Sequence, residues 1–381
     1  MRFIHTADWH LGKLFGQRHM TEDQAYVLEE LLALCKDVHP NALIIAGDVY
    51  DRAIPPPEAV NLFNEILTRI AELGIRVLYI AGNHDSAVRL NFGAQLLRAS
   101  GIYPAGIVRA AEPPVVLSDE YGDVYFSLIP YGDPPHVREA FALDENLSFD
   151  RALAVQIAAA RAQIPLSARS VAVAHAFVIG GQTSESEHAL SVGGSDQVSA
   201  ENFAAYSYTA LGHLHAPQRA GAEHIRYSGS LLKYSFDEAR QKKGVELIEL
   251  DATGAASHTF YPLRPRHDVR IVSGMMDELM HKDFDLLPHD DYIYVELLDM
   301  DAVLAAHEKL RKIYPNLFTI MRPNINVNRL SSTERSYERG KSDLHLFSEF
   351  YADVTASEMT EAERRELIRV IDAMEQGERA E

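Results

Sequence analysis

Residues 2–12 read RFIHTADWHLG, a short apolar run that leads directly into polar residues. Its first five residues have the character of a buried strand, and the polar side chains of Asp8 and His10 follow where that strand would end. The same order returns in residues 42–48 (ALIIAGD) and in residues 76–85 (RVLYIAGNHD). Because parallel strands end at one edge of a sheet, the sequence predicts a buried sheet with a functional edge.

Helical stretches separate these strands. Apolar residues recur at helical spacing at about Thr21–Val38 and at about Glu58–Leu73, and the second stretch follows prolines that suit a helix entry. Three more apolar runs have the length of buried strands: Val124–Ile129, Ser170–Ala174 and Tyr208–Leu211. Strands that alternate with helices predict an α/β layer fold.

The order of elements changes after residue 220. The runs Ile225–Ser228, Gly244–Leu250 and His258–Leu263 follow one another without helices between them. They predict a meander in a second sheet. We therefore expect an α/β protein built as a helix-flanked sandwich of two sheets.

The segment Arg264-Pro265-Arg266 marks a boundary, so residues 1–265 form the first predicted domain. Residues 266–340 alternate three apolar runs with two helical stretches, which predicts a small βαβαβ capping domain. Its elements are expected at Val269–Val272, Met275–Met280, Tyr292–Leu298, Ala302–Ile313 and Leu317–Met321. Residues 341–381 are acidic with apolar residues at helical spacing, so a helical tail is expected.

Composition narrows the class of protein. The chain has 381 residues, 47% of them hydrophobic and 24% charged, which is typical of globular proteins. The single cysteine, Cys35, excludes an intramolecular disulfide framework and a cysteine-rich metal site. No apolar run approaches the roughly 18 residues of a membrane helix, and the start lacks a signal-peptide region. We expect a cytoplasmic protein without membrane contact. The net charge of −19 argues against general nucleic-acid binding.

Five short polar pieces follow apolar runs and together have the composition of a metal site. They are Asp8-Trp9-His10, Gly47-Asp48, Gly82-Asn83-His84-Asp85, His175 and Gly212-His213-Leu214-His215. In extended backbone, residues i and i+2 share a face, so both ligands of the D-x-H and H-x-H pairs can reach one site. Each piece alone is commonly a turn, a cap or a structural histidine. Five of them at strand ends predict convergence on one place.

The ligand types indicate the metal. Carboxylates, an amide oxygen and imidazoles without a thiolate favour Mn²⁺, with Fe²⁺ or Zn²⁺ as alternatives. The candidate ligands are Asp8, His10, Asp48, Asn83, His175, His213 and His215. They exceed the need of one ion, so we expect two divalent ions that share a carboxylate. Two such ions about 3.5–4 Å apart bind a phosphoryl group and activate a bridging water.

The five pieces resemble the calcineurin-like metallophosphoesterases, whose pattern is D-x-H, G-D, G-N-H-D/E, H and G-H-x-H. The surrounding sequence is similar to the bacterial SbcD exonuclease family, the nuclease subunit of the SbcC–SbcD DNA repair complex. The likeness rests on DWHLG (8–12), GDVYDRAIPP (47–56), AGNHDS (81–86), HAFVIGG (175–181) with LSVGGSDQV (190–198), and GHLHAPQ (212–218) with YSGSLLKYSF (227–236). It extends over nearly the whole chain.

The resemblance implies roles for nine residues. One metal would be held by Asp8, His10, Asp48 and His215, and the other by Asp48, Asn83, His175 and His213. His84 would be the catalytic histidine that faces the scissile phosphate, and Asp85 would orient its ring.

The resemblance also implies an activity. The protein would be a manganese-dependent 3′→5′ exonuclease and single-strand endonuclease, which hydrolyses DNA phosphodiester bonds with a hydroxide held by two metal ions. The protein would work at the nucleoid as a homodimer with an SbcC-like ATPase. A small-molecule phosphodiesterase or phosphatase with the same site is the first alternative. A non-enzymatic scaffold is the second, and the complete ligand set argues against it.

Several other features have two interpretations each. The basic residues of 309–339 suit the DNA backbone or a solvated helix face; they are Lys309, Arg311, Lys312, Arg322, Arg329, Arg335 and Arg339. The tail suits docking onto the ATPase or capping of the core. Trp9 suits base stacking or packing, and Arg52 suits a phosphate contact or a salt bridge. Phe177 and the loop 180–194 suit a lip over the site or a solvated loop.

Overall fold

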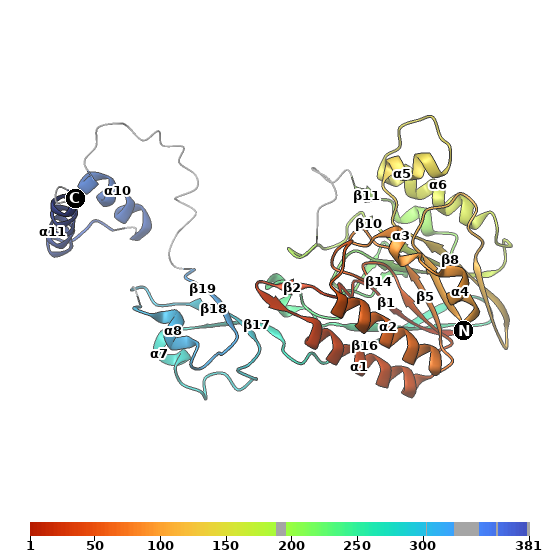
Figure 1. Ribbon diagram of the computed structural model, residues 1–381, viewed down its shortest axis with the longest axis horizontal. Helices are drawn as coiled ribbons and strands as arrows, with labels where there is room; N and C mark the ends of the chain where they lie inside the picture. Colours follow the sequence, from red (N-terminus) through yellow and green to blue (C-terminus); the bar gives the residue numbers. More distant parts are fainter. Residues whose placement is uncertain (188–195, 302, 324–342, 356, 379–381) are drawn as a thin grey trace. The chain divides into compact units, whose positions relative to one another are not determined.

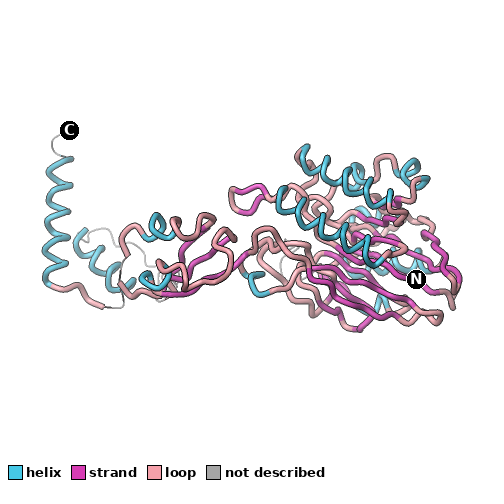
Figure 2. Tube along the Cα trace, turned by 90° about the horizontal axis from the view of Figure 1, so that it is seen from below, coloured by secondary structure: helices cyan, strands magenta, loops and turns pink. Residues whose placement is uncertain are grey.

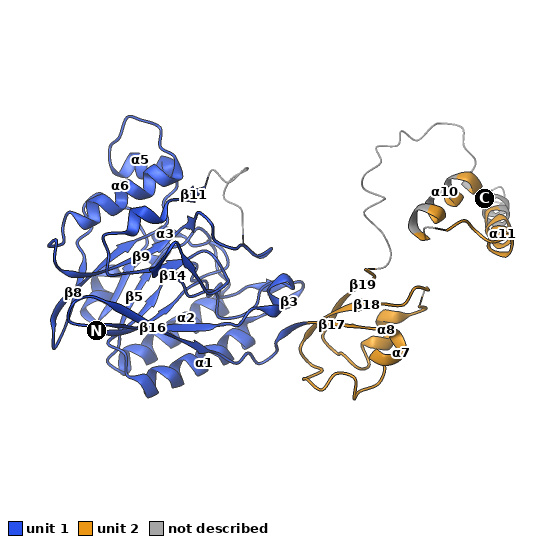
Figure 3. Ribbon diagram, turned by 180° about the vertical axis from the view of Figure 1, so that it is seen from behind, with its two compact units in different colours: residues 1–270 blue, residues 271–381 orange. Residues whose placement is uncertain are grey.

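The chain forms two compact units, Met1–Arg270 and Ile271–Glu381, which are coloured separately in Figure 3. The computed structural model describes residues 1–187, 196–301, 303–323, 343–355 and 357–378. Among the described helices, none combines the length and the apolar character needed to cross a membrane.

The first sheet of unit 1 contains the three strands that open the sequence. Its order is β16-β15-β1-β4-β5-β6. The bounds are β1 Arg2–Thr6, β4 Ala42–Ile45, β5 Arg76–Ile80, β6 Ile102–Ala105, β15 Gly244–Leu250 and β16 Ala256–Pro262. Strands β1, β4, β5 and β6 are parallel neighbours, so β1, β4 and β5 end at one edge as predicted. Strand β15 pairs with β1 in the antiparallel sense.

The second sheet has the order β13-β14-β12-β9-β8-β7. The bounds are β7 Val115–Asp119, β8 Gly122–Ile129, β9 Arg169–His175, β12 Tyr208–Gly212, β13 Gln218–Ala220 and β14 Ala222–Tyr227. Strands β8, β9, β12 and β14 are parallel, and β9 and β12 are buried along their whole length. Short pairs β2–β3 (Leu14–Phe15, Arg18–His19) and β10–β11 (Phe177–Val178, Gln197–Val198) lie outside both sheets.

The predicted meander in the second sheet is wrong. Strand β14 does join that sheet, but β15 and β16 form an antiparallel hairpin at the edge of the first sheet. The free edge of β1 receives β15 in the register Phe3↔Ile248. An apolar run can pair with either sheet, and its partner is decided by the remaining strand edges rather than by local sequence.

The core of unit 1 lies between the two sheets. Phe3 of the first sheet meets the edges of Phe126 and Tyr208 of the second, with ring centroids 5.7 and 5.8 Å apart. All three rings are almost completely buried. Edge-to-face aromatic pairs add about 0.5–1.5 kcal/mol to the burial of the rings. This apolar contact fixes the two sheets face to face, which positions their edges for a shared site.

Helices cover the outer faces of both sheets (Figures 1 and 2). On the first sheet lie α1 (Thr21–Val38), which matches the predicted range, and α2 (Pro57–Glu72), which has proline at its entry. Helix α6 (Phe149–Arg161) contacts β8 of the second sheet, and the Ser148 side chain caps its first turn. The shorter helices are α3 (Ala87–Leu90), α4 (Ala94–Ala99) and α5 (Pro134–Ala140). The helix-flanked two-sheet sandwich is therefore confirmed.

Unit 2 begins with a three-stranded sheet of order β17-β18-β19. The elements run β17 (Val269–Gly274), α7 (Met276–Leu279), β18 (Tyr292–Leu297), α8 (Ala306–Leu310) and β19 (Leu317–Met321), which is the predicted βαβαβ order. Helix α8 begins later than predicted, because Ala305 has a left-handed backbone, and it ends at Leu310 rather than at Ile313. The tail forms α10 (Asp343–Thr355) and α11 (Glu361–Glu378).

Candidate metal centre

All seven predicted ligands lie together at one edge of unit 1. Asp8 and His10 follow β1, Asp48 follows β4, and Asn83 follows β5, all from the first sheet. His175 ends β9, and His213 and His215 follow β12, all from the second sheet. Six of these side chains are at most 5% exposed, and Asn83 is half-buried. The site therefore joins the two sheets, which explains why strand ends from both halves of the sequence are needed.

Four of the ligands have an unusual backbone conformation. Asp8, His10, Asp48 and His213 have positive φ angles of 53°, 45°, 48° and 105°. The Asp8 and His10 N–H groups donate to the carbonyl oxygens of Gly47 and Asp48, at 3.1 and 3.0 Å. Such conformations cost of order 1–3 kcal/mol each, so they persist only where the surroundings enforce them. The sheet edge holds these residues in strained positions that aim their side chains inward.

Asp48 occupies the middle of the site. Its Oδ2 lies 3.3 Å from His175 Nε2, 3.7 Å from His10 Nε2 and 3.9 Å from His84 Nε2. Its Oδ1 accepts the backbone N–H of His84 at 2.9 Å. One carboxylate that faces imidazoles from three different loops has the position expected of a shared ligand.

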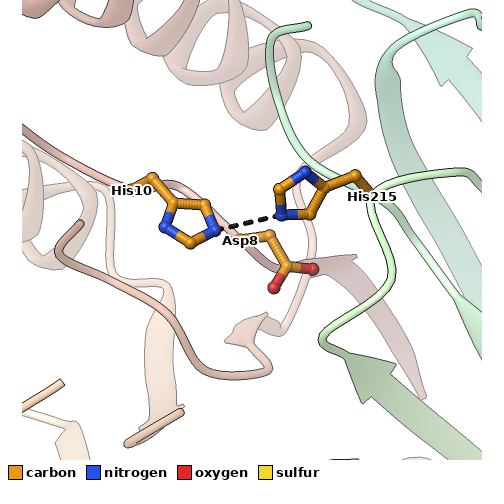
Figure 4. Close-up of side chains that lie close together, drawn as sticks. All are labelled: Asp8, His10 and His215. Carbon is orange, nitrogen blue, oxygen red and sulfur yellow. Dashed lines mark hydrogen bonds between the residues drawn. The ribbon is translucent and has the colours of Figure 1, made fainter. Parts of the chain in front are cut away.

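The remaining ligands form two groups around Asp48. In the first group, His10 Nε2 lies 3.1 Å from His215 Nε2, and Asp8 lies beside them (Figure 4). In the second group, Asn83 Oδ1 lies 3.0 Å from His175 Nε2 and 3.1 Å from His213 Nδ1. Nitrogen and oxygen lone pairs that converge in a buried space repel one another unless a cation lies between them. The donor set therefore fits divalent metal ions.

Burial and neighbouring charges set the protonation of the predicted ligands. Although burial opposes it, the charge of Asp48 raises the pKa of His175 to about 9. Burial lowers the pKa of His213 to about 3 and the pKa of His10 well below its usual value. Both imidazoles stay neutral at pH 7, which is the form that binds metal. Burial also raises the pKa of Asp8 well above its usual value. For Asp48, burial opposes ionisation, but the neighbouring His175 outweighs it and keeps the pKa of Asp48 low.

Hydrogen bonds on the outer nitrogens fix the ligand rings. His175 Nδ1 donates to the carbonyl oxygen of Ala46 at 2.9 Å, which turns Nε2 toward Asp48 and Asn83. His215 Nδ1 donates to the Ser186 hydroxyl at 2.7 Å, which leaves Nε2 free to face His10. Outer partners of this kind hold the tautomer and orientation of metal-binding histidines.

The two predicted catalytic residues have different surroundings. His84 Nδ1 donates to the backbone carbonyl oxygen of Asp51 at 2.8 Å. The Asp85 carboxylate instead accepts the backbone N–H groups of Val49, Tyr50 and Gly82, at 3.1, 2.9 and 3.0 Å. Asp85 thus ties the loop after β4 to the loop after β5, and burial followed by the Asp48 charge raises its pKa to about 7.

The predicted role of Asp85 is therefore corrected. The hydrogen bond that fixes the His84 ring comes from the Asp51 carbonyl, because the carboxylate of Asp85 turns toward the backbone amides. The Asp51 side chain accepts from Lys13 Nζ at 2.8 Å. No residue-type signal marks a backbone carbonyl, so sequence reasoning could not find this contact.

Other predicted neighbours are resolved by the structure. Trp9 is fully buried, donates from Nε1 to Thr6 Oγ1 at 2.9 Å and packs edge-on against Phe63, so the packing interpretation is confirmed. Arg52 is exposed, with its guanidinium 3.8 Å from Asp51. The half-buried Phe177 ring lies 6.1 Å from the His213 ring. Of the loop 180–194, residues 188–194 lie outside the described part of the chain.

Sequence reasoning missed a polar group behind His215. Glu187, Glu238 and Lys243 all reach this residue or its partners, and the last two are almost completely buried. Charged residues buried this deeply are uncommon unless they are paired. No local pattern announces them, because they lie far from His215 in the sequence.

Two family models and two solved structures match parts of this chain. Residues 1–217 match the family model of calcineurin-like phosphoesterases, and residues 265–355 match the SbcD_C model, described as type 5 capsule protein repressor C-terminal domain. The crystal structure of TT1561 of Thermus thermophilus matches at 11% identity, covering 68% of this chain and 98% of that one, with a TM-score of 0.39. A novel archaeal phosphodiesterase matches at 9% identity, covering 68% and 100%, with a TM-score of 0.31. The first family model spans more than half of the chain and includes all seven predicted ligands, so the chain belongs to the calcineurin-like phosphoesterase family and is a hydrolase of phosphoester bonds.

Proposed function

We propose that this protein is the nuclease subunit of an SbcC–SbcD-like DNA repair complex. It would act as a metal-dependent 3′→5′ exonuclease and single-strand endonuclease in the cytoplasm, at the nucleoid. One observation supports this above the others: a complete phosphoesterase ligand set and an SbcD-type C-terminal module occur in the same chain.

The proposed metal assignment follows the two groups of ligands. Asp8, His10, Asp48 and His215 would hold one ion, and Asp48, Asn83, His175 and His213 the other. Mn²⁺ is the proposed ion, because the set mixes hard oxygen donors with imidazoles and contains no thiolate. When bound, the ions would activate water and offset the charge of a phosphodiester.

The chain's own contribution centres on His84. Its side chain is 9% exposed, against 3% or less for Asp48 and His175, so it lies toward the mouth of the site. The Asp51 carbonyl holds Nδ1, and Nε2 points to the Asp48 side of the cluster. Since Nδ1 already carries a proton, Nε2 is placed to donate a proton or a hydrogen bond to a phosphoryl or leaving-group oxygen when the ring is an imidazolium.

A nuclease assay tests this proposal. Purified protein with Mn²⁺ should degrade linear and hairpin DNA, with and without a large ATPase of the SbcC type. His84→Gln should bind the same amount of Mn²⁺ and lose cleavage. Absence of DNA cleavage under both conditions would reject the nuclease. Turnover of cyclic nucleotides or a chromogenic phosphodiester far faster than DNA would instead support the small-molecule alternative.

The proposed partners use other parts of the chain. In the helical tail, Ile368 and Val370 are 38% and 48% exposed on α11, which suits docking onto an ATPase. On unit 1, Val88, Phe92 and Leu96 are 71–85% exposed and recur every four residues, which suits a homodimer contact. Deletion of residues 343–378 should abolish ATPase binding. The double substitution Phe92→Ser with Leu96→Ser should give a monomer.

DNA contact by residues 309–339 is part of the same proposal. Lys309, Arg311 and Lys312 are exposed, and the Arg322 guanidinium donates to the carbonyl oxygen of Asp301. Arg329, Arg335 and Arg339 lie outside the described residues. Neutralising the first three should weaken DNA binding and reduce its salt dependence.

A further inference from the structure

The segment Ser184–Glu187 contacts the metal ligand His215 directly. It follows β10 in the sequence and is attached to the body of unit 1 by backbone hydrogen bonds. The Glu185 N–H donates to Asp237 Oδ2 at 2.9 Å, and the Gln182 N–H donates to Gln218 Oε1 at 2.8 Å. These contacts place the segment behind the His215 ring, on the side away from the other ligands.

Every polar group of His215 has a partner, and all except Nε2 have theirs outside the predicted ligands. Its N–H donates to Glu187 Oε1 at 2.5 Å, and its carbonyl oxygen accepts from Lys243 Nζ at 2.7 Å. Its Nδ1 lies 2.7 Å from Ser186 Oγ. Nε2 alone faces the site, 3.1 Å from His10 Nε2. The residue is thereby held in one orientation from three directions.

The Ser186 hydroxyl links His215 to a buried carboxylate. It donates to Glu238 Oε1, so its oxygen is left to accept from His215 Nδ1. Glu238 Oε1 also accepts from Ser235 Oγ at 2.9 Å, and Oε2 lies 2.6 Å from Lys243 Nζ. Glu238 Oε1 itself is 3.4 Å from Nδ1, too far for a strong bond, so the serine makes the connection.

The direction of these bonds has a chemical consequence. A proton held on Nδ1 by the hydroxyl leaves a lone pair on Nε2, which is the form that binds a metal ion. Without the hydroxyl, Nδ1 has no strong acceptor, and the ring is free to rotate or to carry its proton on Nε2. Metal affinity at this group of ligands would fall as a result.

We propose that Ser186 and Glu187 are positioning residues that set the affinity of the site for the one ion bound by Asp8, His10, Asp48 and His215. This inference rests on the two-ion assignment made under the proposed function. It gives the described part of the loop after β10 a role in metal binding, distinct from a lip over the substrate.

The test is a pair of isosteric variants, Ser186→Val and Ser186→Thr, titrated with Mn²⁺ by calorimetry and equilibrium dialysis in the absence of DNA. Ser186→Val should lower the affinity for one of the two ions by about 10- to 100-fold, the range typical of outer partners of metal ligands. Ser186→Thr, which keeps the hydroxyl, should restore tight binding. The second ion should be unaffected in both variants.

A second pair covers the case in which Ser186→Val fails to fold. Glu187→Ala removes the acceptor of the His215 N–H, whereas Glu185→Ala removes an exposed carboxylate from the same segment. Only Glu187→Ala should lower the affinity for the ion assigned to His215. Equal affinities across either folded pair, or an equal loss of both ions, would overturn the inference.

These outcomes are separable from the failure of the proposed function. If the wild type binds two Mn²⁺ ions but cuts no DNA, the nuclease is rejected while the titrations still decide the role of Ser186. If DNA is cut and Ser186→Val matches the wild type in both affinities, the nuclease stands and the positioning role is rejected.

Discussion

His175 and His215 lie at the same metal centre, but different kinds of neighbour hold them. His175 ends a strand, and its outer nitrogen bonds to the main-chain carbonyl of Ala46, at the end of β4. His215 lies in the turn after β12, and the side chains of Ser186, Glu187 and Lys243 hold it. The first ligand is fixed by a main-chain carbonyl of the other sheet, and the second by side chains.

This difference predicts which substitutions disrupt each half of the site. The His175 half is the group of His175, Asn83 and His213, and the His215 half is the group of His215, His10 and Asp8. A partner that is a backbone carbonyl remains when any single side chain is replaced, so the His175 half should break only when the backbone moves. A partner that is a side chain disappears with one substitution, so the His215 half should be adjustable.

Asp48→Asn should disrupt both halves of the site together, because the Asp48 carboxylate faces both. Loss of the shared carboxylate should lower the affinity for both Mn²⁺ ions. Nuclease activity should fall by more than about 100-fold, beyond the usual effect of an outer partner. Calorimetric titration and a DNA cleavage assay measure the two effects. Glu120→Gln, which neutralises an exposed carboxylate, is the control. A variant that lost only one ion would show that Asp48 is not shared.

Gly47→Ala should disrupt the His175 half, because a side chain added to this backbone position would displace the His175 ring. Gly47 has φ +91°, and an added Cβ would lie 2.3 Å from His175 Nδ1, the atom that donates to Ala46. We expect a loss of about 3 kcal/mol in the free energy of unfolding, together with weaker binding of the ion assigned to His175.

Gly74→Ala is the matched control for this prediction. Gly74 also has a positive φ of +77°, but its added Cβ would meet nothing within 4 Å. It should cost about 1 kcal/mol, from backbone strain alone, and leave both ions in place. Equal denaturant midpoints for the two variants would contradict the argument, because only one of them clashes with a ligand.

The pH dependence of stability tests the connection between the two sheets that support the two halves. His5 of β1 accepts from the Tyr208 hydroxyl at 3.0 Å and donates to the Leu211 carbonyl at 3.1 Å, and burial lowers its pKa to about 3. The unfolded chain binds a proton at this histidine below about pH 6.5, whereas the folded chain does not. Its contribution is therefore complete above pH 6.5 and declines as the pH falls toward 3.

The expected size is about 1.4 kcal/mol per pH unit below 6.5. Guanidinium unfolding at pH 7.5 and pH 5.5, in the presence of a chelator, should show a smaller drop for His5→Gln than for the wild type. The exposed His136→Gln should behave as the wild type. If His5→Gln lost as much stability as the wild type over this range, the buried neutral histidine would not be the cause.

Arg52→Gln should have the smallest effect. Arg52 lies near the site, but it is 53% exposed and 3.8 Å from Asp51. Exposed ion pairs contribute about 0–1 kcal/mol, so the free energy of unfolding and both Mn²⁺ affinities should change little. A selective rise in KM for DNA would assign Arg52 to phosphate binding. A loss of metal would instead extend the ligand environment beyond the residues described above.

Local chemistry explains what could be predicted from the sequence. A buried strand needs a continuous apolar run, and a metal ligand needs a donor side chain, so β1, β4, β5 and the seven candidate ligands could be predicted from short stretches. The structure brings those seven side chains together. The range Thr21–Val38 was predicted as a helix for the same reason, because helical spacing is a local pattern.

Only the tertiary structure decided the rest. The antiparallel hairpin β15–β16 joins the first sheet because an edge of β1 is available there. The Asp51 carbonyl, rather than Asp85, fixes the His84 ring, and Ser186 and Glu187 reach His215 across 28–29 residues of sequence. Such contacts depend on which groups meet after the sheets have packed, and backbone carbonyls have no residue signature. Short sequence motifs thus predict which atoms are candidates for metal binding, whereas the packing of the two sheets decides what holds those atoms in place.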